Sequence, residues 1–277
     1  VQKSKRKGVD LDYLFTQVFV NEARTSTSQN CGNILAGVGP FAIENNLIKA
    51  TEPKTTLTIY LENSDSLADV TFFTPCGVVQ YEGNARIDGV PGTASPVMIS
   101  FRGTEGSTCG SLLPTGQIIE TVNDVDVTCI DNGMPVVLFR ADAVNRTGYE
   151  SRDNLDSDLE IKKKIEAIRL AISEKMNLGD VTNKSVPKMT MVSAPKKGGS
   201  ICTRSFIPHD CHAAIGVFAA ISVGTALMLP GSIAHEVGVV PDGGTNLISV
   251  EHPTGEILIK MDIDKSGKVN KIKRAEL

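Results

Sequence analysis

Two cysteines, each followed by an uncharged run of small and apolar residues, do most to restrict the fold of this chain. Cys31 precedes the run 34–43, and Cys211, 180 residues later, precedes the run 214–229. Runs that are apolar on all sides are typical of helices surrounded by protein. The pattern therefore predicts two buried helices, each with a thiol at its N-terminal end.

A thiol in that position has a chemical consequence. The first N–H groups of a helix lack partners and carry roughly half a positive charge, which binds carboxylates and lowers the pKa of a thiol. Two such helix ends predict two similar halves that share a carboxylate-binding site. That arrangement suits proton transfer at a carbon beside a carboxylate.

Composition excludes several other classes of protein. With 277 residues, of which 41% are hydrophobic, the chain can form two modest domains with cores of their own. A net charge of -4 argues against nucleic acid as a partner. Six cysteines without a CxxC pair do not resemble a disulfide framework, which favours the reducing cytoplasm.

The uncharged stretch 213–229 needs separate treatment, because its 17 residues approach the length that crosses a bilayer. Ala, Gly, Ser and Thr make up much of it, Pro208 precedes it and Pro230 follows it. We therefore expect a helix inside the protein and no membrane partner.

The remaining pattern is mostly β. Segment 156–176 is expected to be an amphipathic surface helix, with Leu159 and Leu170 among its apolar residues. Pro40 lacks a backbone donor and predicts either a kink or a second helix with Pro40 in its first turn. Alternating or apolar segments bounded by turn residues predict strands at 13–20, 55–61, 70–73, 97–101, 136–139, 247–250 and 256–262.

A domain crossover is expected around 112–116, which divides the chain into an N-terminal half, 1–115, and a C-terminal half, 116–277. The first half is expected to be truncated at its start. The chain begins with Val1 rather than Met, and no obvious structural unit precedes its first predicted strand. It ends in charged, helix-like sequence. The chain is therefore predicted to be a piece of a longer protein.

Segment 30–44, which reads Asn-Cys-Gly-Asn-Ile-Leu-Ala-Gly-Val-Gly-Pro-Phe-Ala-Ile-Glu, resembles the signature of a known family. Segments 87–93, 112–116, 130–135, 184–189 and 205–216 match it in order and spacing. This is the 2-methylaconitate isomerase and 4-oxalomesaconate tautomerase (PrpF-like) family. The resemblance implies an α/β (α+β) fold like that of diaminopimelate epimerase. That fold has two pseudo-symmetric halves, each a β-sheet or barrel around a central helix, with the active site between them.

The resemblance also implies an activity. The family shifts a double bond by 1,3-allylic proton transfer in an aconitate-like or oxalomesaconate-like polycarboxylate, without a cofactor. In epimerases of this fold two cysteines act as paired acid and base, and Cys31 and Cys211 occupy the matching positions. In the isomerase branch, a lysine just upstream of the segment that starts at Val1 is thought to share the proton work with the first cysteine.

Further site residues are expected to bind substrate. Arg204 stands where the epimerases hold a carboxylate-binding arginine, and Ser185, between Lys184 and Lys188, matches a substrate-contact position. His212 is expected to donate a hydrogen bond to a substrate carboxylate. The predicted substrate-binding set is Asn30, Gly32, Asn33, Thr115, Met134, Lys184, Ser185, Arg204, His212 and Ala213.

No metal is expected. His209, Cys211 and His212 lie close together, but the sequence supplies no further Cys or His cluster to complete a site. The other cysteines, at 76, 109, 129 and 202, fall in sequence of β character and are expected to be structural.

Two alternative functions stay open at this point. One is an amino-acid epimerase or racemase that uses Cys31 and Cys211 as two bases, and the other is a non-catalytic polycarboxylate-binding protein. The sequence does not choose among the polycarboxylates, since they differ by a methyl, hydroxyl or keto group. The expected partners are a small di- or tricarboxylate and, in a homodimer, a second copy of the chain.

Overall fold

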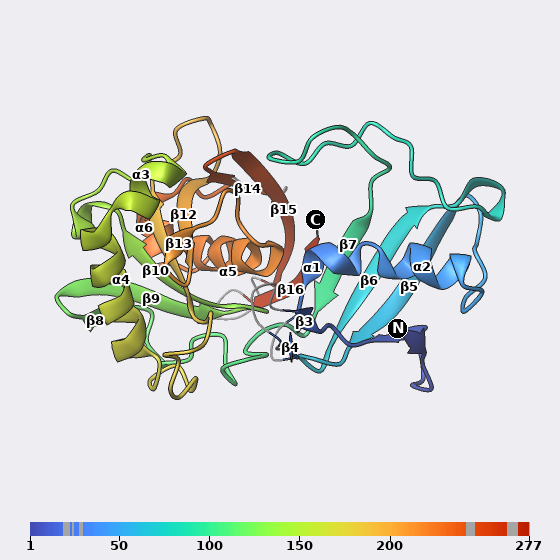
Figure 1. The fold of residues 1–277 in the computed structure, drawn as a ribbon, viewed down its shortest axis with the longest axis horizontal. Helices are drawn as coiled ribbons and strands as arrows, with labels where there is room; N and C mark the ends of the chain where they lie inside the picture. Colours follow the sequence, from blue (N-terminus) through green and yellow to red (C-terminus); the bar gives the residue numbers. More distant parts are fainter. Residues whose placement is uncertain (19–22, 24, 28–29, 242–246, 265–270, 277) are drawn as a thin grey trace. The chain divides into compact units, whose positions relative to one another are not determined.

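The computed structural model describes residues 1–277 except 19–22, 24, 28–29, 242–246, 265–270 and 277 (Figure 1). The chain forms two compact units. Unit 1 comprises Val1–Thr104 together with the segment from Arg274, and unit 2 comprises Glu105–Lys273. The boundary expected at residue 115 thus lies inside unit 2, and the end of the chain returns to unit 1.

Unit 1 is a mainly antiparallel sheet with two short helices. Its longest strands alternate between buried and exposed residues, which is typical of a sheet with one face in the core. The strands pair in the order β1 (Gln2–Lys3), β2 (Leu11–Tyr13), β5 (Lys54–Leu61), β6 (Ser66–Phe73), β7 (Met98–Arg102) and β16 (Lys271–Glu276). The other elements are α1 (Gly32–Leu35), α2 (Val38–Glu44), the 3-10 helix η1 (Pro75–Gly77), and a hairpin of β3 (Gln17–Val18) and β4 (Thr25–Ser26).

The first apolar run is broken into two helices at Gly37, and Pro40 lies in the first turn of α2, as the sequence predicts. Helix α2 packs closely on β6 through Gly39, where an added Cβ would overlap the buried ring of Phe72.

We therefore expect Gly39→Ala to destabilise the protein by about 1–3 kcal/mol, because the ring has no room to move in a packed core. Gly37→Ala is the matched control, since its Cβ would lie 3.6 Å from the Ile34 carbonyl oxygen, an ordinary contact. Urea unfolding of both variants measures the difference. Equal stability of the two would show that α2 does not pack as described.

Unit 2 is built around helix α5 (Val217–Leu227), which contacts four strands and is buried from Phe218 to Leu227. Its sheet runs in the order β15 (Gly255–Asp264), β14 (Leu247–His252), β12 (Ile201–Ile207), β11 (Lys188–Ser193), β10 (Pro135–Arg140), β9 (Val125–Asp131) and β8 (Glu120–Val122). Strand β13 (Asp210–Cys211) pairs with β12, and α6 (Ile233–Val237) packs beside α5. The predicted internal helix is thus confirmed. Within the described ranges, no helix has the length and hydropathy needed to span a bilayer.

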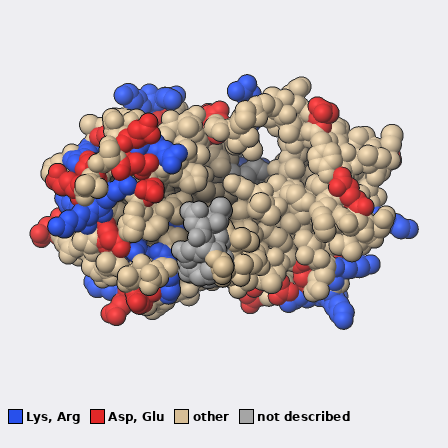
Figure 2. Space-filling model, in the orientation of Figure 1, with Lys and Arg blue, Asp and Glu red and all other residues tan. Residues whose placement is uncertain are grey.

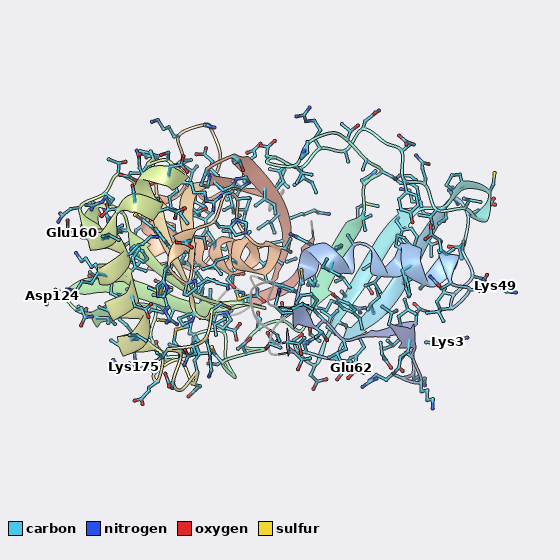
Figure 3. The ribbon with its side chains drawn as sticks, in the orientation of Figure 1. Lys3, Lys49, Glu62, Asp124, Glu160 and Lys175 are labelled. Carbon is cyan, nitrogen blue, oxygen red and sulfur yellow. The ribbon has the colours of Figure 1, made fainter. Side chains whose placement is uncertain are left out.

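The other side of this sheet is covered by α3 (Arg152–Ser157) and α4 (Leu159–Ile172), with the 3-10 helix η2 (Asp142–Val144) before them (Figure 1). Between α4 and the sheet lies a hydrophobic cluster, here called the α4 core. It includes Val137, Phe139, Ile161, Ile165, Ile168, Met189, Met191, Phe206 and Cys211. Positive and negative side chains are mixed over the charged part of unit 2 in Figure 2. Glu160 and Lys175 point outward in Figure 3.

Two details of the predicted elements are wrong. The strand expected at 13–20 ends at Tyr13, β3 covers only Gln17–Val18, and residues 19–20 lie outside the described residues. The helix expected at 156–176 is split, because the Asp158 carboxylate accepts the Ile161 N–H at 3.1 Å and starts α4 anew. The other predicted strands are present with slightly different bounds.

Candidate active site

Cys31 lies at the start of a helix, as predicted. It is the N-cap of α1, with extended backbone (φ -128°, ψ 105°), and its carbonyl accepts the Leu35 N–H at 3.2 Å. The Cys31 side chain makes no capping hydrogen bond to the first turn, so it leaves the backbone N–H groups there without an acceptor from the N-cap. The thiol is half-buried. Helix α1 has only four residues, so its dipole is weaker than the ten-residue run suggested.

The residues around Cys31 are held by a chain of side-chain hydrogen bonds. The Asn30 amide donates to the Ser64 hydroxyl, which lies 2.7 Å from the Ser66 hydroxyl oxygen. The Asn30 carbonyl oxygen is buried and has no partner among the described residues. Asn63 donates to the backbone carbonyls of Phe15 and Thr27 at 2.8 and 2.7 Å. These bonds fasten the segment before Cys31 to the turn between β5 and β6.

Tyr13 is a neighbour of Cys31 that the sequence did not single out. Burial, followed by the negative charge of the Cys31 thiolate, raises the pKa of Tyr13 to about 12. Its hydroxyl is buried and makes no hydrogen bond within the described part of the chain. Tyr13 therefore stays protonated at neutral pH beside the thiol. The only sequence signal was its place as the first residue of the strand predicted at 13–20.

Cys211 does not lie at a helix end, and this prediction is wrong. Helix α5 has Gly216 as its N-cap, whereas Cys211 sits on β13 opposite Phe206 of β12. Its backbone N–H donates to the Asp156 carboxylate at 2.6 Å, and its side chain belongs to the α4 core. Burial raises the pKa of the Cys211 thiol to about 11. The hairpin with β12 holds this part of the chain extended.

The segment 212–216 between Cys211 and α5 is half-buried, apart from Ile215, and carries His212. The His212 N–H donates to the Ser205 carbonyl at 2.8 Å, and its Nδ1 accepts the Ala214 N–H at 2.9 Å. Burial lowers the pKa of His212, and the nearby positive charge of Lys188 lowers it further. The ring is therefore neutral at neutral pH, with its proton on Nε2. Such a ring donates one hydrogen bond without adding charge.

This assignment predicts a specific NMR result. In the 15N spectrum, His212 should show a bare Nδ1 and a protonated Nε2 at pH 7. Its titration midpoint should lie below the ordinary histidine value of about 6.5. The spectrum of His212→Gln identifies the signals. A midpoint at or above the ordinary value would contradict the assignment.

The motif 130–135 acts mainly as a support. The Asp131 carboxylate accepts the N–H groups of Thr108 and Cys109 at 2.8 and 2.7 Å. The Asn132 amide donates to the Thr225 hydroxyl at 2.9 Å, and the Met134 carbonyl accepts from Ser222 at 2.7 Å. These contacts fix the middle and last turn of α5 against the turn between β9 and β10. Met134, predicted to bind substrate, thus contributes its backbone to packing, and its side chain is half-buried.

Three other predicted residues are engaged by the protein. Thr115 pairs with the backbone of Gln117 within one turn, at 3.3–3.4 Å. Lys184 donates to the Leu178 carbonyl at 2.8 Å, and the Ala213 carbonyl accepts from Thr254 at 2.9 Å.

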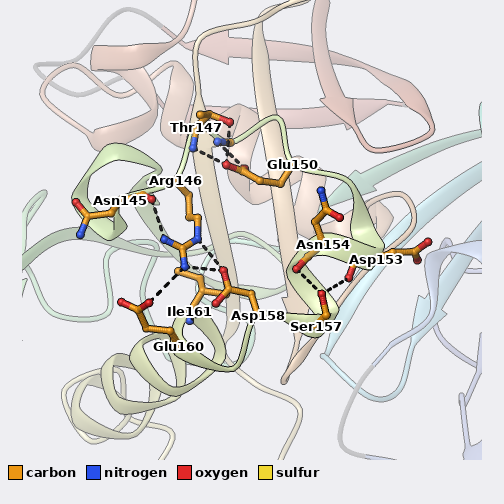
Figure 4. Close-up of polar contacts among 11 residues, drawn as sticks. Asn145, Arg146, Thr147, Glu150, Asp153, Asn154, Ser157, Asp158, Glu160 and Ile161 are labelled. Atoms are coloured by element: carbon orange, nitrogen blue, oxygen red, sulfur yellow. Dashed lines mark hydrogen bonds and ion pairs between the residues drawn. The ribbon is translucent and has the colours of Figure 1, made fainter.

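Arg204, which was predicted to bind a substrate carboxylate, is buried and donates hydrogen bonds to the protein itself. Its Nε donates to the Glu150 carbonyl and its Nη1 to the Thr203 carbonyl, both at 2.8 Å. The loop that offers the Glu150 carbonyl is itself tied down (Figure 4). Glu150 accepts the Thr147 N–H at 2.7 Å, and Arg146 binds Asp158. Arg204 therefore anchors this loop to β12.

Ser185 is half-buried in a loop that Arg169 organises. The Arg169 guanidinium is fully buried and donates to the carbonyls of Val181, Lys184 and Val186 at 2.9–3.2 Å. It also forms a two-point ion pair with Glu166, with both distances 2.7 Å. Leu159 and Leu170 were predicted to be among the apolar residues of this amphipathic helix. In fact Leu170 is 41% exposed and Leu159 78% exposed.

No metal site is formed by His, Cys, Asp and Glu side chains in the described ranges. His209 instead lies 3.1 Å from the Glu166 carboxylate. All six cysteines are free. Cys76 is exposed on η1 and Cys109 is buried in a turn, so their expected place in β structure is wrong. Cys129 and Cys202 are buried on β9 and β12.

Comparison with known proteins decides the family. The family model described as PrpF protein matches residues 1–277. The chain belongs to the PrpF family. It is 56% identical over 269 residues to the (4E)-oxalomesaconate Delta-isomerase of Novosphingobium sp. strain KA1, which covers 97% of this chain and 75% of that protein. Its characterised relatives are named as isomerases or tautomerases.

Solved structures confirm the fold class. A methylitaconate-delta-isomerase crystal structure superposes with a TM-score of 0.85 at 28% identity, over 99% of this chain and 76% of that one. A probable proline racemase from Agrobacterium radiobacter K84 gives a TM-score of 0.52 at 13% identity, over 99% of this chain and 70% of that one. The second match shows the fold alone. The PrpF chain thus has the epimerase-like α/β architecture expected from its motifs.

Proposed function

We propose that this PrpF protein is a cofactor-independent cytoplasmic isomerase that moves a carbon–carbon double bond in an oxalomesaconate-like tricarboxylate. The observation that carries the proposal is Cys31 at the N-cap of α1, inside a segment that matches the family signature. The 56% identity to an oxalomesaconate isomerase supports the substrate class. Six free thiols support a reducing compartment.

The proposed reaction is a 1,3-proton shift. A base takes a proton from the allylic carbon beside a carboxylate, and the electron pair of that C–H bond forms the new double bond. The old double bond opens, and its far carbon receives a proton, so the composition of the substrate is unchanged. Cys31 exchanges one of these protons with the substrate. The negative intermediate needs fixed donors, and we assign this role to the N–H groups of Gly32 and Asn33 in the first turn of α1.

The epimerase alternative requires a second thiol as base. Cys211 is a poor candidate, because it is buried in the α4 core and its pKa is raised to about 11. A two-thiol mechanism is therefore not supported by the position of Cys211.

Proton NMR in D2O tests the proposal with the complete gene product. The substrates are 4-oxalomesaconate, 2-methyl-trans-aconitate and trans-aconitate. We expect a double-bond shift with deuterium uptake in at least the first. No shift and no uptake with all three would overturn the proposal. Binding of these acids without turnover would instead identify a polycarboxylate-binding protein.

A further inference from the structure

Lys188 carries a buried charge that the fold does not satisfy. It is the first residue of β11 and is 6% exposed. In the described part of the chain, its ammonium group makes no hydrogen bond and no ion pair. Two other buried cations among the described residues of unit 2, Arg169 and Arg204, are each bonded to backbone carbonyls. The nitrogen is not one of the fully buried polar atoms that lack a partner, so it keeps some access to solvent. A largely buried ammonium group with no protein partner and one open side suits an anion that binds from outside.

The charged group that acts on Lys188 is positive: it is Arg169, on α4. The neutral ring of His212 lies near Lys188 on the segment after β13. Burial, followed by the charge of Arg169, lowers the pKa of Lys188 to about 8. Arg152 on α3 adds positive charge near His212. These neighbours repel a metal ion and favour an anion.

The strand register places Lys188 on the same side of the sheet as the residues that hold His212. Side chains alternate along β11, so Met189 and Met191 face the α4 core while Lys188 and Thr190 face the other side. The Thr190 hydroxyl lies 3.1 Å from that of Ser205, and the Ser205 carbonyl accepts the His212 N–H. Lys188 and His212 thus belong to one framework of neighbouring strands.

We propose that the ammonium group of Lys188 and the Nε2–H of His212 form a carboxylate subsite in unit 2, which takes one carboxylate of the substrate. The subsite rests on the proposed function for the identity of its ligand. A cation with a neutral donor in its neighbourhood suits a carboxylate, because each can bond one of its oxygens.

Calorimetric binding of tricarballylate to the complete gene product tests the subsite. This saturated tricarboxylate has no double bond, so binding is measured without turnover. We expect Lys188→Met to weaken binding by about 10- to 100-fold, the loss of one charged hydrogen bond. The control Lys175→Met removes an exposed lysine that pairs with Glu120 at 2.9 Å, and should bind like the wild type (Figure 3).

Two further measurements separate a binding role from a structural one. Without ligand, Lys188→Met should melt at a higher temperature than the wild type, because it removes a buried unpaired charge and keeps an apolar side chain. A lysine that holds the fold together would give the opposite result. Second, a bound carboxylate raises the pKa of Lys188 above about 8. The wild type should therefore take up protons when it binds tricarballylate at pH 8.5, measured in buffers of different ionisation enthalpy.

Unchanged binding by Lys188→Met would overturn the subsite, and so would the absence of proton uptake by the wild type. The second outcome does not depend on whether the variant folds. If the wild type binds tricarballylate through Lys188 but isomerises none of the three acids, the proposed function fails and the subsite stands.

Discussion

Cys31→Ser is expected to lower the turnover of the isomerisation by about 10²- to 10⁴-fold, the usual contribution of a positioned acid or base. A serine hydroxyl has nearly the same shape but gives up its proton far less readily than a thiol, whose ordinary pKa is about 8.5. The backbone N–H groups of Gly32 and Asn33 remain, so KM should change little. Initial rates of the double-bond shift, followed by NMR, measure both quantities.

Cys211→Ser is the matched control, because it makes the same atomic change in the other cysteine of the pair. Cys211 is buried in the α4 core, so we expect turnover within a few-fold of the wild type. The hydroxyl would be buried among apolar side chains, at a cost of about 1–3 kcal/mol in stability. Similar losses of turnover in both variants would favour a two-thiol mechanism instead.

The parts of the fold that depend on local sequence were predicted well. The uncharged run before Pro230 forms the buried helix α5, and Pro40 starts α2 as its fixed backbone geometry requires. The strands predicted at 55–61 and 70–73 are present as β5 and β6, whose alternation matches the spacing of a half-buried sheet. These features need no knowledge of distant contacts.

The errors arise where contacts with a segment distant in the sequence determine the local structure. Cys211 precedes an apolar run, but pairing with β12 keeps it extended and delays the helix until Gly216. The burial of Arg169 and Lys188 was missed for the same reason. Arg169 is one of the charged residues in the segment predicted to be a surface helix, and Lys188 was named only as a neighbour of Ser185. Their burial depends on neighbours that the fold supplies.

In the candidate site, too, the residues set by local sequence were predicted and those set by distant contacts were not. Cys31 was identified from its own segment, and its position at the start of α1 is confirmed. Tyr13, on β2, is a neighbour of Cys31 through the fold rather than through spacing in sequence. Arg204 was expected to hold substrate, but its donors bond to Glu150 and Thr203, which only the structure reveals.

Arg169→Met is expected to have the largest effect on stability, a loss of about 3–5 kcal/mol, as when one partner of a buried ion pair is removed. The methionine side chain fills much of the same space but donates no hydrogen bonds. The Glu166 carboxylate and the carbonyls of Val181, Lys184 and Val186 would lose their donor. Urea unfolding measures the loss. Arg140→Met is the control, because its pair with Asp142 is exposed and worth about 0–1 kcal/mol.

Arg169→Lys distinguishes the geometry of this residue from its charge. A lysine keeps the positive charge but lacks the planar group that binds Glu166 at two points and reaches three carbonyls. It should therefore lose most of the stability that Arg169→Met loses. Since the same carbonyls shape the loop that carries Ser185, KM for the polycarboxylate should rise in both variants. A lysine variant as stable as the wild type would show that charge alone holds this loop.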